Sequence, residues 1–300
     1  MRRIRTAVAL GFVAVLLVSG CAGARPPGVD GNLTDGWPTM PDPTLPVPAD
    51  HACYAPSDPS SRTYQLPAPV GCDTRHTLET IHIGMITGDD AAGDLPPPAG
   101  GPAQQREYGD CANVARDFVG DDWRTGRIGL DVVLPTAAQW DADARWYRCD
   151  LVEFTDLDSY EVAERTASLR GALAGARPLA LTCFAVTTKA DAVDTMGAVD
   201  CGTGHNGEFA GVWEAPPGGY PADDAQREKT ELAGCRSVVA SFAGVPNDDK
   251  LRYRVGQITF GFGKGDWDLG NRGVRCYIWM DGKNLTRSLK GAGTGALPIN

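Results

Sequence analysis

The spacing of the cysteines constrains this chain more than any other feature. Eight of the nine cysteines fall into two sets of four, in which the first and third gaps recur. The first set is Cys53, Cys72, Cys111 and Cys149, and the second set is Cys183, Cys201, Cys235 and Cys276. The first gap is 19 residues in one set and 18 in the other, and the third gap is 38 and 41. Because repeated spacing is the mark of a duplicated unit, we expect two tandem modules, at 51–178 and 179–300.

Local sequence matches support the duplication. Cys72-x₃-His76-x₂-Glu79 returns as Cys201-x₃-His205-x₂-Glu208. Trp140-Asp141-x₃-Arg145-x₂-Arg148-Cys149 returns as Trp267-Asp268-x₃-Arg272-x₂-Arg275-Cys276. Ser168-Leu169-Arg170-Gly171-Ala172 returns as Ser288-Leu289-Lys290-Gly291-Ala292. The apolar positions 108, 111, 115 and 118, and likewise 232, 235, 239 and 242, have helical spacing and are followed by Gly120 and Gly244, where a helix C-terminus favours glycine.

The order of patterns predicts β-β-α-β-β in each module, an α+β class with a mostly antiparallel sheet and a helix on one face. The strands expected in the first module are 52–54, 81–85, 128–134 and 145–154. Those expected in the second are 182–184, one after Glu208, 255–260 and 273–280. We also expect a helix over 159–173 between the modules and a flexible hairpin loop at 261–265.

The N-terminus predicts export and lipidation. Three arginines within the first five residues precede an apolar run at 7–18, which is too short for a membrane span. Val18-Ser19-Gly20-Cys21 resembles a bacterial lipobox, so we expect residues 1–20 to be a signal peptide and Cys21 to carry lipid. Residues 21–50 are rich in proline and predict an extended tether. The chain is thus expected to be lipid-anchored on the extracytoplasmic face of the cell membrane.

The net charge excludes one class of partner, and the predicted export indicates the redox state of the cysteines. The formal net charge is −10 at pH 7, which excludes nucleic acid as a partner held by bulk electrostatics. An even number of cysteines in an exported chain indicates disulfides. If both modules fold alike, the simplest pairing is within modules. The expected bridges are Cys53–Cys72, Cys111–Cys149, Cys183–Cys201 and Cys235–Cys276.

The Cys-x₃-His-x₂-Glu element admits several chemistries. A structural disulfide is the first, since Cys72 and Cys201 each have a partner cysteine at a matching distance. The second is a metal site in which Cys72, His76, Cys201 and His205 are ligands, although His82, the candidate fourth ligand, aligns with Gly211. Cys-His catalysis is the third. His76 with Glu79, and His205 with Glu208, either hydrogen-bond locally or contact a ligand.

The Trp-Arg element has two interpretations. Trp140 and Trp267 could stack on Arg145 and Arg272, with Asp141 paired to an arginine, and so fix a long loop to the sheet. Alternatively, the tryptophans and the arginines Arg145, Arg148, Arg272 and Arg275 form a recognition patch for an anionic wall polymer or an acidic protein segment. No Gly-x-Ser-x-Gly, His-Glu-x₂-His or phosphate-binding loop occurs, so we expect no catalytic residue, no cofactor and no enzyme.

A cysteine, then Cys-x₃-His-x₂-Glu, a cysteine-bearing helix and a late Trp-x₄-Arg before a fourth cysteine together resemble the actinobacterial septum formation family of exported or membrane-attached proteins. The resemblance implies a process, cell division, and no known reaction. We therefore expect a non-enzymatic binding or scaffolding factor in septum or envelope assembly, whose partners are envelope proteins or wall polymer. The alternatives are an envelope metal-binding protein and, third, a wall-acting hydrolase.

Overall fold

The computed structural model describes residues 47–56, 68–190 and 192–299. The predicted signal peptide, the lipidation site Cys21 and nearly all of the predicted tether lie outside these residues. Among the helices that the described residues form, none combines the length and apolar character needed to cross a bilayer.

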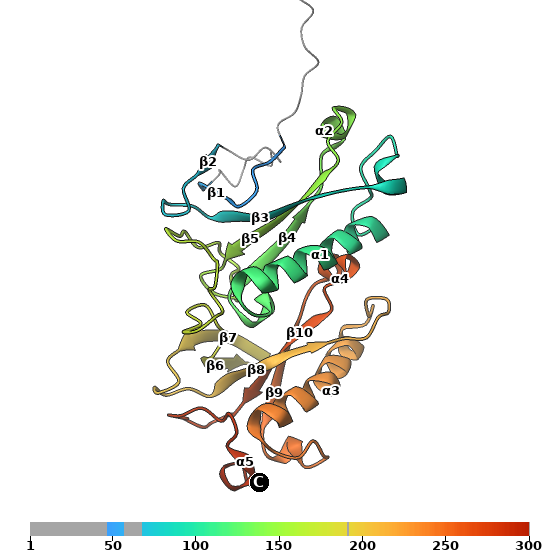
Figure 1. The fold of residues 1–300 in the computed structure, drawn as a ribbon. Helices are drawn as coiled ribbons and strands as arrows, with labels where there is room; N and C mark the ends of the chain where they lie inside the picture. The colour runs from blue at the N-terminus through green and yellow to red at the C-terminus, as the bar shows by residue number, and fades with distance from the viewer. Residues whose placement is uncertain (1–46, 57–67, 191, 300) are drawn as a thin grey trace, which may run out of the picture. The chain divides into compact units, whose positions relative to one another are not determined.

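Each half of the described chain forms a five-stranded antiparallel sheet (Figure 1). The first has the order β2-β1-β3-β5-β4 and the second β7-β6-β8-β10-β9. The strands of the first are β1 (Ala52–Tyr54), β2 (Pro69–Val70), β3 (Leu78–Met85), β4 (Ile128–Val133) and β5 (Trp146–Glu153). Those of the second are β6 (Cys183–Lys189), β7 (Ala192–Val199), β8 (Gly207–Glu214), β9 (Gly256–Gly261) and β10 (Gly273–Trp279). The α+β class with two similar modules is confirmed.

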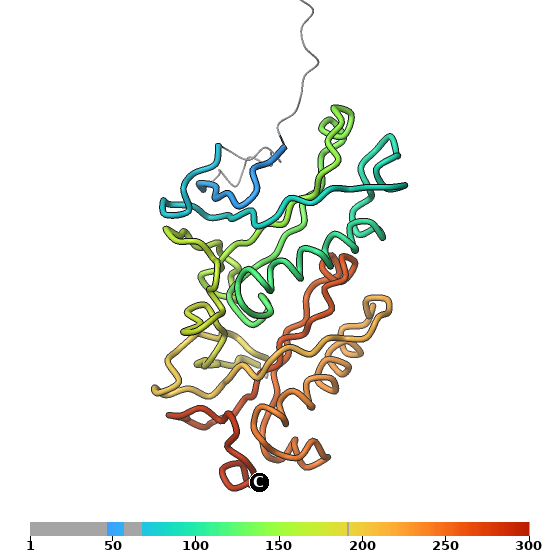
Figure 2. The backbone as a smooth tube through the Cα atoms, viewed as in Figure 1, coloured from blue at the N-terminus to red at the C-terminus, as the bar shows by residue number. Residues whose placement is uncertain are grey.

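One long helix belongs to each sheet, and Figure 2 shows the backbone passing through the same succession of strands and helix twice. These helices are α1 (Pro102–Val119) and α3 (Asp224–Ala243). Both end at a glycine in the left-handed region, with φ of 94° at Gly120 and 68° at Gly244. The predicted apolar face of α1 is buried, including Cys111 with no exposed surface. The shorter helices are η1 (Gly88–Ala91), η2 (Trp123–Thr125), α2 (Ala137–Asp141), η3 (Leu251–Tyr253), α4 (Lys264–Leu269) and α5 (Gly293–Ala296).

The two sheets share an irregularity that supports the duplication. The register between β3 and β5 shifts between Thr80 and His82. In the second sheet Cys276 pairs with Gly211 and Tyr277 with Phe209, so the extra residue falls at the equivalent place. A β-bulge locally bends and twists its strand, and a repeated bulge indicates that both modules need the same bend.

The predicted set of strands was incomplete, and the predicted helix at 159–173 was wrong. Each sheet has an additional strand, β2 or β7, between the first two cysteines of its set. Residues 159–173 form no helix: Phe154 bridges Val162, and His76 bridges Arg165. The backbone groups of this segment bond to strands and to the end of α1, as when Leu173 N–H donates to Val119 at 2.8 Å. These tertiary hydrogen bonds replace those of a helix. The expected hairpin loop at 261–265 was also wrong, because Gly261 ends β9 and α4 begins at Lys264.

All four disulfides join the expected cysteines within modules. Cys53–Cys72 and Cys183–Cys201 attach the first strand of each module to the turn before the His-Glu element. Cys111–Cys149 attaches α1 to β5, and Cys235–Cys276 attaches α3 to β10. A loop of this size closed by a disulfide stabilises a fold by about 3–4 kcal/mol.

Candidate functional site

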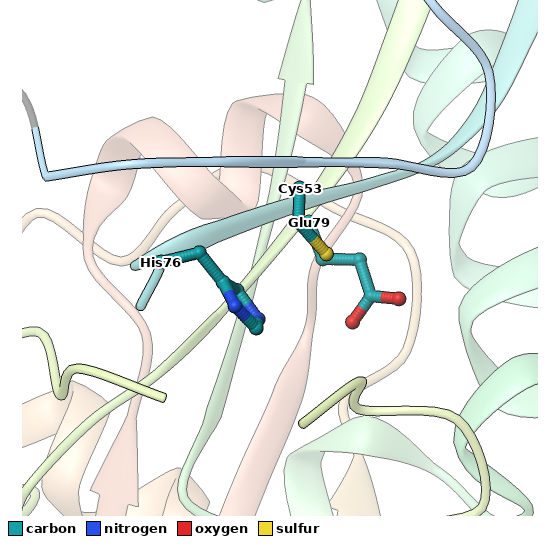
Figure 3. Close-up of side chains that lie close together, drawn as sticks. All are labelled: Cys53, His76 and Glu79. Carbon is teal, nitrogen blue, oxygen red and sulfur yellow. The ribbon is translucent and has the colours of Figure 1, made fainter. Parts of the chain in front are cut away.

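Cys53, His76 and Glu79 meet beneath the first sheet (Figure 3). Cys53 in β1 pairs in register with Glu79 in β3, which places both residues beside the turn that carries His76. Ligand-type atoms of the three side chains lie within 4.8 Å of one another. Their exposed fractions are 0%, 1% and 3%. The second module brings Cys183, His205 and Glu208 together in the same way.

In the first module the imidazole is fixed in one tautomer. The Nδ1 atom of His76 lies 2.7 Å from the carbonyl oxygen of Thr74. Because a carbonyl only accepts hydrogen bonds, Nδ1 carries the proton. The Nε2 atom is buried and has no hydrogen-bond partner among the described residues.

Glu79 has a different partner from the one expected. Its Oε1 accepts from Ser168 Oγ at 2.6 Å, and its Oε2 accepts from Leu169 N–H at 2.7 Å. In the second module Glu208 accepts from Ser288 Oγ at 2.7 Å and from Leu289 N–H at 2.8 Å. The glutamates therefore fasten the segment that closes each module.

The second module differs in one contact. His205 Nδ1 lies 2.9 Å from the carbonyl oxygen of Thr203, and its Nε2 lies 3.2 Å from Glu208 Oε1. Both ring nitrogens thus face oxygen atoms that can accept hydrogen bonds. The expected local His-Glu hydrogen bond is present here, whereas among the described residues His76 makes none to Glu79.

The disulfides limit what these clusters can bind as they stand. Zinc is bound by cysteine thiolates, and all four cysteines beside the histidines are oxidised in pairs. The metal alternative named Cys72 and Cys201, but the sulfurs grouped with the imidazoles belong to Cys53 and Cys183. In the oxidised protein each cluster offers only an imidazole and a carboxylate.

The tryptophans have the predicted role of fixing loops. The Trp140 indole is 1% exposed and donates to the carbonyl of Gly93 at 2.7 Å. The Arg145 guanidinium carbon lies 3.8 Å from the centroid of that ring. In the second module Trp267 donates to Gly218 at 2.8 Å, with Arg272 5.7 Å from its ring. Both bonds attach a short helix to the loop that precedes the long helix.

Arg148 on β5 and Arg275 on β10 are buried and do not lie on the surface. Arg148 is 4% exposed and pairs through Nε with Asp150 at 2.7 Å. Burial raises the pKa of Asp150, against the opposing influence of Arg148. Arg275 is 2% exposed and donates from Nε to the carbonyl of Arg124 at 2.9 Å. Of the four arginines in the predicted recognition patch, Arg145 and Arg272 therefore remain.

A groove of about 1110 Å³ opens beside the second cluster. Its lining includes Glu208 of β8, Ser237, Ser241 and Phe242 of α3, and Lys290 of the closing segment. Asp121 and Thr125 of the first module complete one wall. A groove of this size is adequate for a sizeable ligand.

One aromatic ring distinguishes the groove from its counterpart in the first module. There the equivalent Phe118 stacks with His51, with ring centroids 6.3 Å apart, and Arg170 lies 4.2 Å over its ring. Phe242 has neither kind of partner among the described residues, and Lys290, the equivalent of Arg170, is exposed. The groove therefore presents a partly buried aromatic ring, which has no stacked partner among the described residues, and an exposed ammonium group.

Comparison with known proteins places the chain in a family. No curated protein and no solved structure matches it. The family described as septum formation matches residues 52–276, a span that runs from β1 into β10 and includes all eight paired cysteines. Since this match covers most of the chain, the protein belongs to the septum formation family.

Proposed function

We propose that this protein is a non-enzymatic binding factor of the cell envelope that acts in septum formation. The family match supports the process. The disulfides support an oxidising compartment outside the cytoplasm, since such bonds are rare in reducing compartments. Lipidation at Cys21 would hold the modules at the extracytoplasmic face of the cell membrane, with residues 22–50 as the tether.

The groove beside α3 is the observation that carries the binding role. It combines the partly buried Phe242 ring, the hydroxyls of Ser237 and Ser241, and the exposed Lys290 ammonium. Hydroxyl groups and an unpaired ammonium suit a polyol that bears negative charge, and an aromatic ring provides an apolar contact. The ligand that fits best is an anionic wall polymer, while the remaining surface is left for envelope proteins.

Filling the groove tests this role. Ser241 is exposed on α3 and lines the groove, so Ser241→Trp should occupy it without disturbing the core. Lys229→Trp, at an exposed position of the same helix, is the matched control. In cells that lack the gene, we expect the control to restore septum placement and Ser241→Trp to fail, with equal protein levels and melting temperatures. If Ser241→Trp restores septation as well as the control does, the groove is not the site.

A further inference from the structure

The buried Cys-His-Glu clusters carry an inference that goes beyond the proposed function. We propose that the Cys53–Cys72 disulfide closes a latent zinc site, which opens when the disulfide is reduced. Its ligands are the two thiolates, His76 Nε2 and a Glu79 oxygen. The second module holds the equivalent set Cys183, Cys201, His205 and Glu208.

The hydrogen bonds around His76 are those of a metal ligand. A zinc-bound histidine usually donates its second ring N–H to a carbonyl or carboxylate, which fixes the ring and leaves the other nitrogen free to bind. His76 donates Nδ1–H to Thr74 at 2.7 Å, and the free Nε2 is buried without a partner among the described residues. Figure 3 shows the imidazole on the same side of the sheet as Cys53 and Glu79. A buried, unpaired acceptor is costly unless something binds it.

The Glu79 carboxylate is also held in place by hydrogen bonds that leave it able to bind a metal. Ser168 Oγ and Leu169 N–H each bond to one oxygen of Glu79. Each carboxylate oxygen has two lone pairs, so one oxygen can bind zinc while these hydrogen bonds persist. The closing segment of the module would then orient the ligand, as outer partners do in zinc sites.

Three of the four ligands need only small movements. The ligand atoms of Cys53, His76 and Glu79 lie within 4.8 Å of one another, and the Cys72 sulfur is bonded to that of Cys53. Zinc binds sulfur at about 2.3 Å and nitrogen at about 2.0 Å, so tetrahedral ligand atoms lie about 3.5 Å apart. Cys53, His76 and Glu79 reach this spacing by shifts of about 1 Å, and the Cys72 sulfur moves away from Cys53 once the bond between them breaks.

The reaction balances with a thiol reductant. A dithiol gives two electrons and two protons to the S–S bond, which breaks to two cysteine thiols while the dithiol closes to its own disulfide. Zinc then displaces the two thiol protons. Cys72 is partly exposed, whereas Cys111 and Cys149 have no exposed surface. Mild reduction should therefore open Cys53–Cys72 before the helix-to-strand bond.

The two modules should differ in affinity. His205 Nε2 lies 3.2 Å from Glu208 Oε1, while His76 Nε2 has no hydrogen-bond partner among the described residues. Zinc must displace the His205–Glu208 contact before it can bind His205. We therefore expect the first module to bind zinc at least tenfold more tightly.

The test is zinc titration of the full chain before and after mild reduction with a water-soluble phosphine, which is oxidised to its phosphine oxide with oxygen from water as it reduces the disulfide. We expect no tight binding to the oxidised chain and two sites of unequal affinity in the reduced chain. His76→Ala should weaken the tighter site at least tenfold. His82→Ala, on β3 and outside the cluster, should leave both sites unchanged. Cobalt in place of zinc should give the absorption of a tetrahedral site with two thiolates.

Two results would overturn the proposal. One is equal binding by His76→Ala and His82→Ala, which would mean that the thiols bind metal without the imidazole. The other concerns reduced chains that lose their native circular dichroism. Zinc should then restore the native spectrum in the wild type and not in His76→Ala, and failure to restore it would reject a site built by the fold. Neither result bears on the groove, which Ser241→Trp tests in the oxidised protein.

Discussion

At the scale of single residues, Glu107 on α1 is a buried acid whose hydrogen bonding is incomplete. It is 7% exposed, and its Oε2 has no hydrogen-bond partner among the described residues. Burial raises its pKa above the ordinary 4.5, against the opposing charge of Arg106. The folded state thus holds the proton more tightly than the unfolded state, so stability falls as the pH rises from about 4.5 through the folded pKa and is constant above it.

Glu107→Gln should remove this penalty. We expect the variant to be more stable than the wild type by about 1 kcal/mol at pH 7.5 and equally stable near pH 4. Urea unfolding at the two pH values measures the difference. Asp117→Asn, at a largely exposed side chain of the same helix, should change little at either pH. A gain for Glu107→Gln that is the same at both pH values would show that ionisation is not its cause.

At the scale of elements, the short helix α2 fastens the loop before α1. Thr136 begins it with a capping box to Gln139, and Trp140 then reaches Gly93. Trp140→Phe should remove this hydrogen bond and part of the contact with Arg145, at a cost of about 2 kcal/mol. Trp267→Phe is the matched variant, and because that ring is partly exposed and more distant from its arginine, it should cost less than half as much. Equal losses in thermal unfolding would contradict a role that depends on burial.

How much the sequence predicts can be judged element by element. The helices α1 and α3 followed from apolar spacing and terminal glycines, and β5 and β10 were expected at the repeated Arg-Cys element. Strand β2 is only two residues long, and β7 exists through its pairing with β6, so neither has a strong pattern of its own. The segment 159–173 has residues that suit a helix, yet hydrogen bonds to distant strands determine its conformation.

The candidate site was also predictable only in part. Repetition identified the histidine and glutamate of both clusters and the disulfides, but it grouped Cys72 and Cys201 with them where the structure places Cys53 and Cys183. It did not show that Glu79 would bond to the segment at Ser168, although the recurrence of Ser-Leu in both modules was a signal for this. The groove and the free state of His76 Nε2 depend on side chains from separate elements. Spacing in one chain does not contain that information.

At the scale of the whole molecule, Arg275 of the second module forms hydrogen bonds to the first module. Arg148 pairs with Asp150 inside its own sheet, but the residue equivalent to Asp150 in the second module is Tyr277. Arg275 therefore lacks that carboxylate and donates instead to the carbonyls of Arg124 and Gly126 in the first module. Burial lowers the pKa of Arg275. Arg124 itself pairs with Glu214 of the second module at 2.6 Å.

These contacts predict cooperative unfolding. The described residues belong to one compact unit, so calorimetry of the wild type should show a single transition with equal calorimetric and van't Hoff enthalpies. Arg275→Lys keeps the charge but loses the forked geometry that reaches two carbonyls, so the modules should melt separately and the enthalpy ratio should rise above one. Arg252→Lys, at an exposed arginine of η3, should leave the ratio unchanged. A single unaltered transition in Arg275→Lys would mean that the modules are coupled through other contacts, with the buried arginine serving only the second sheet.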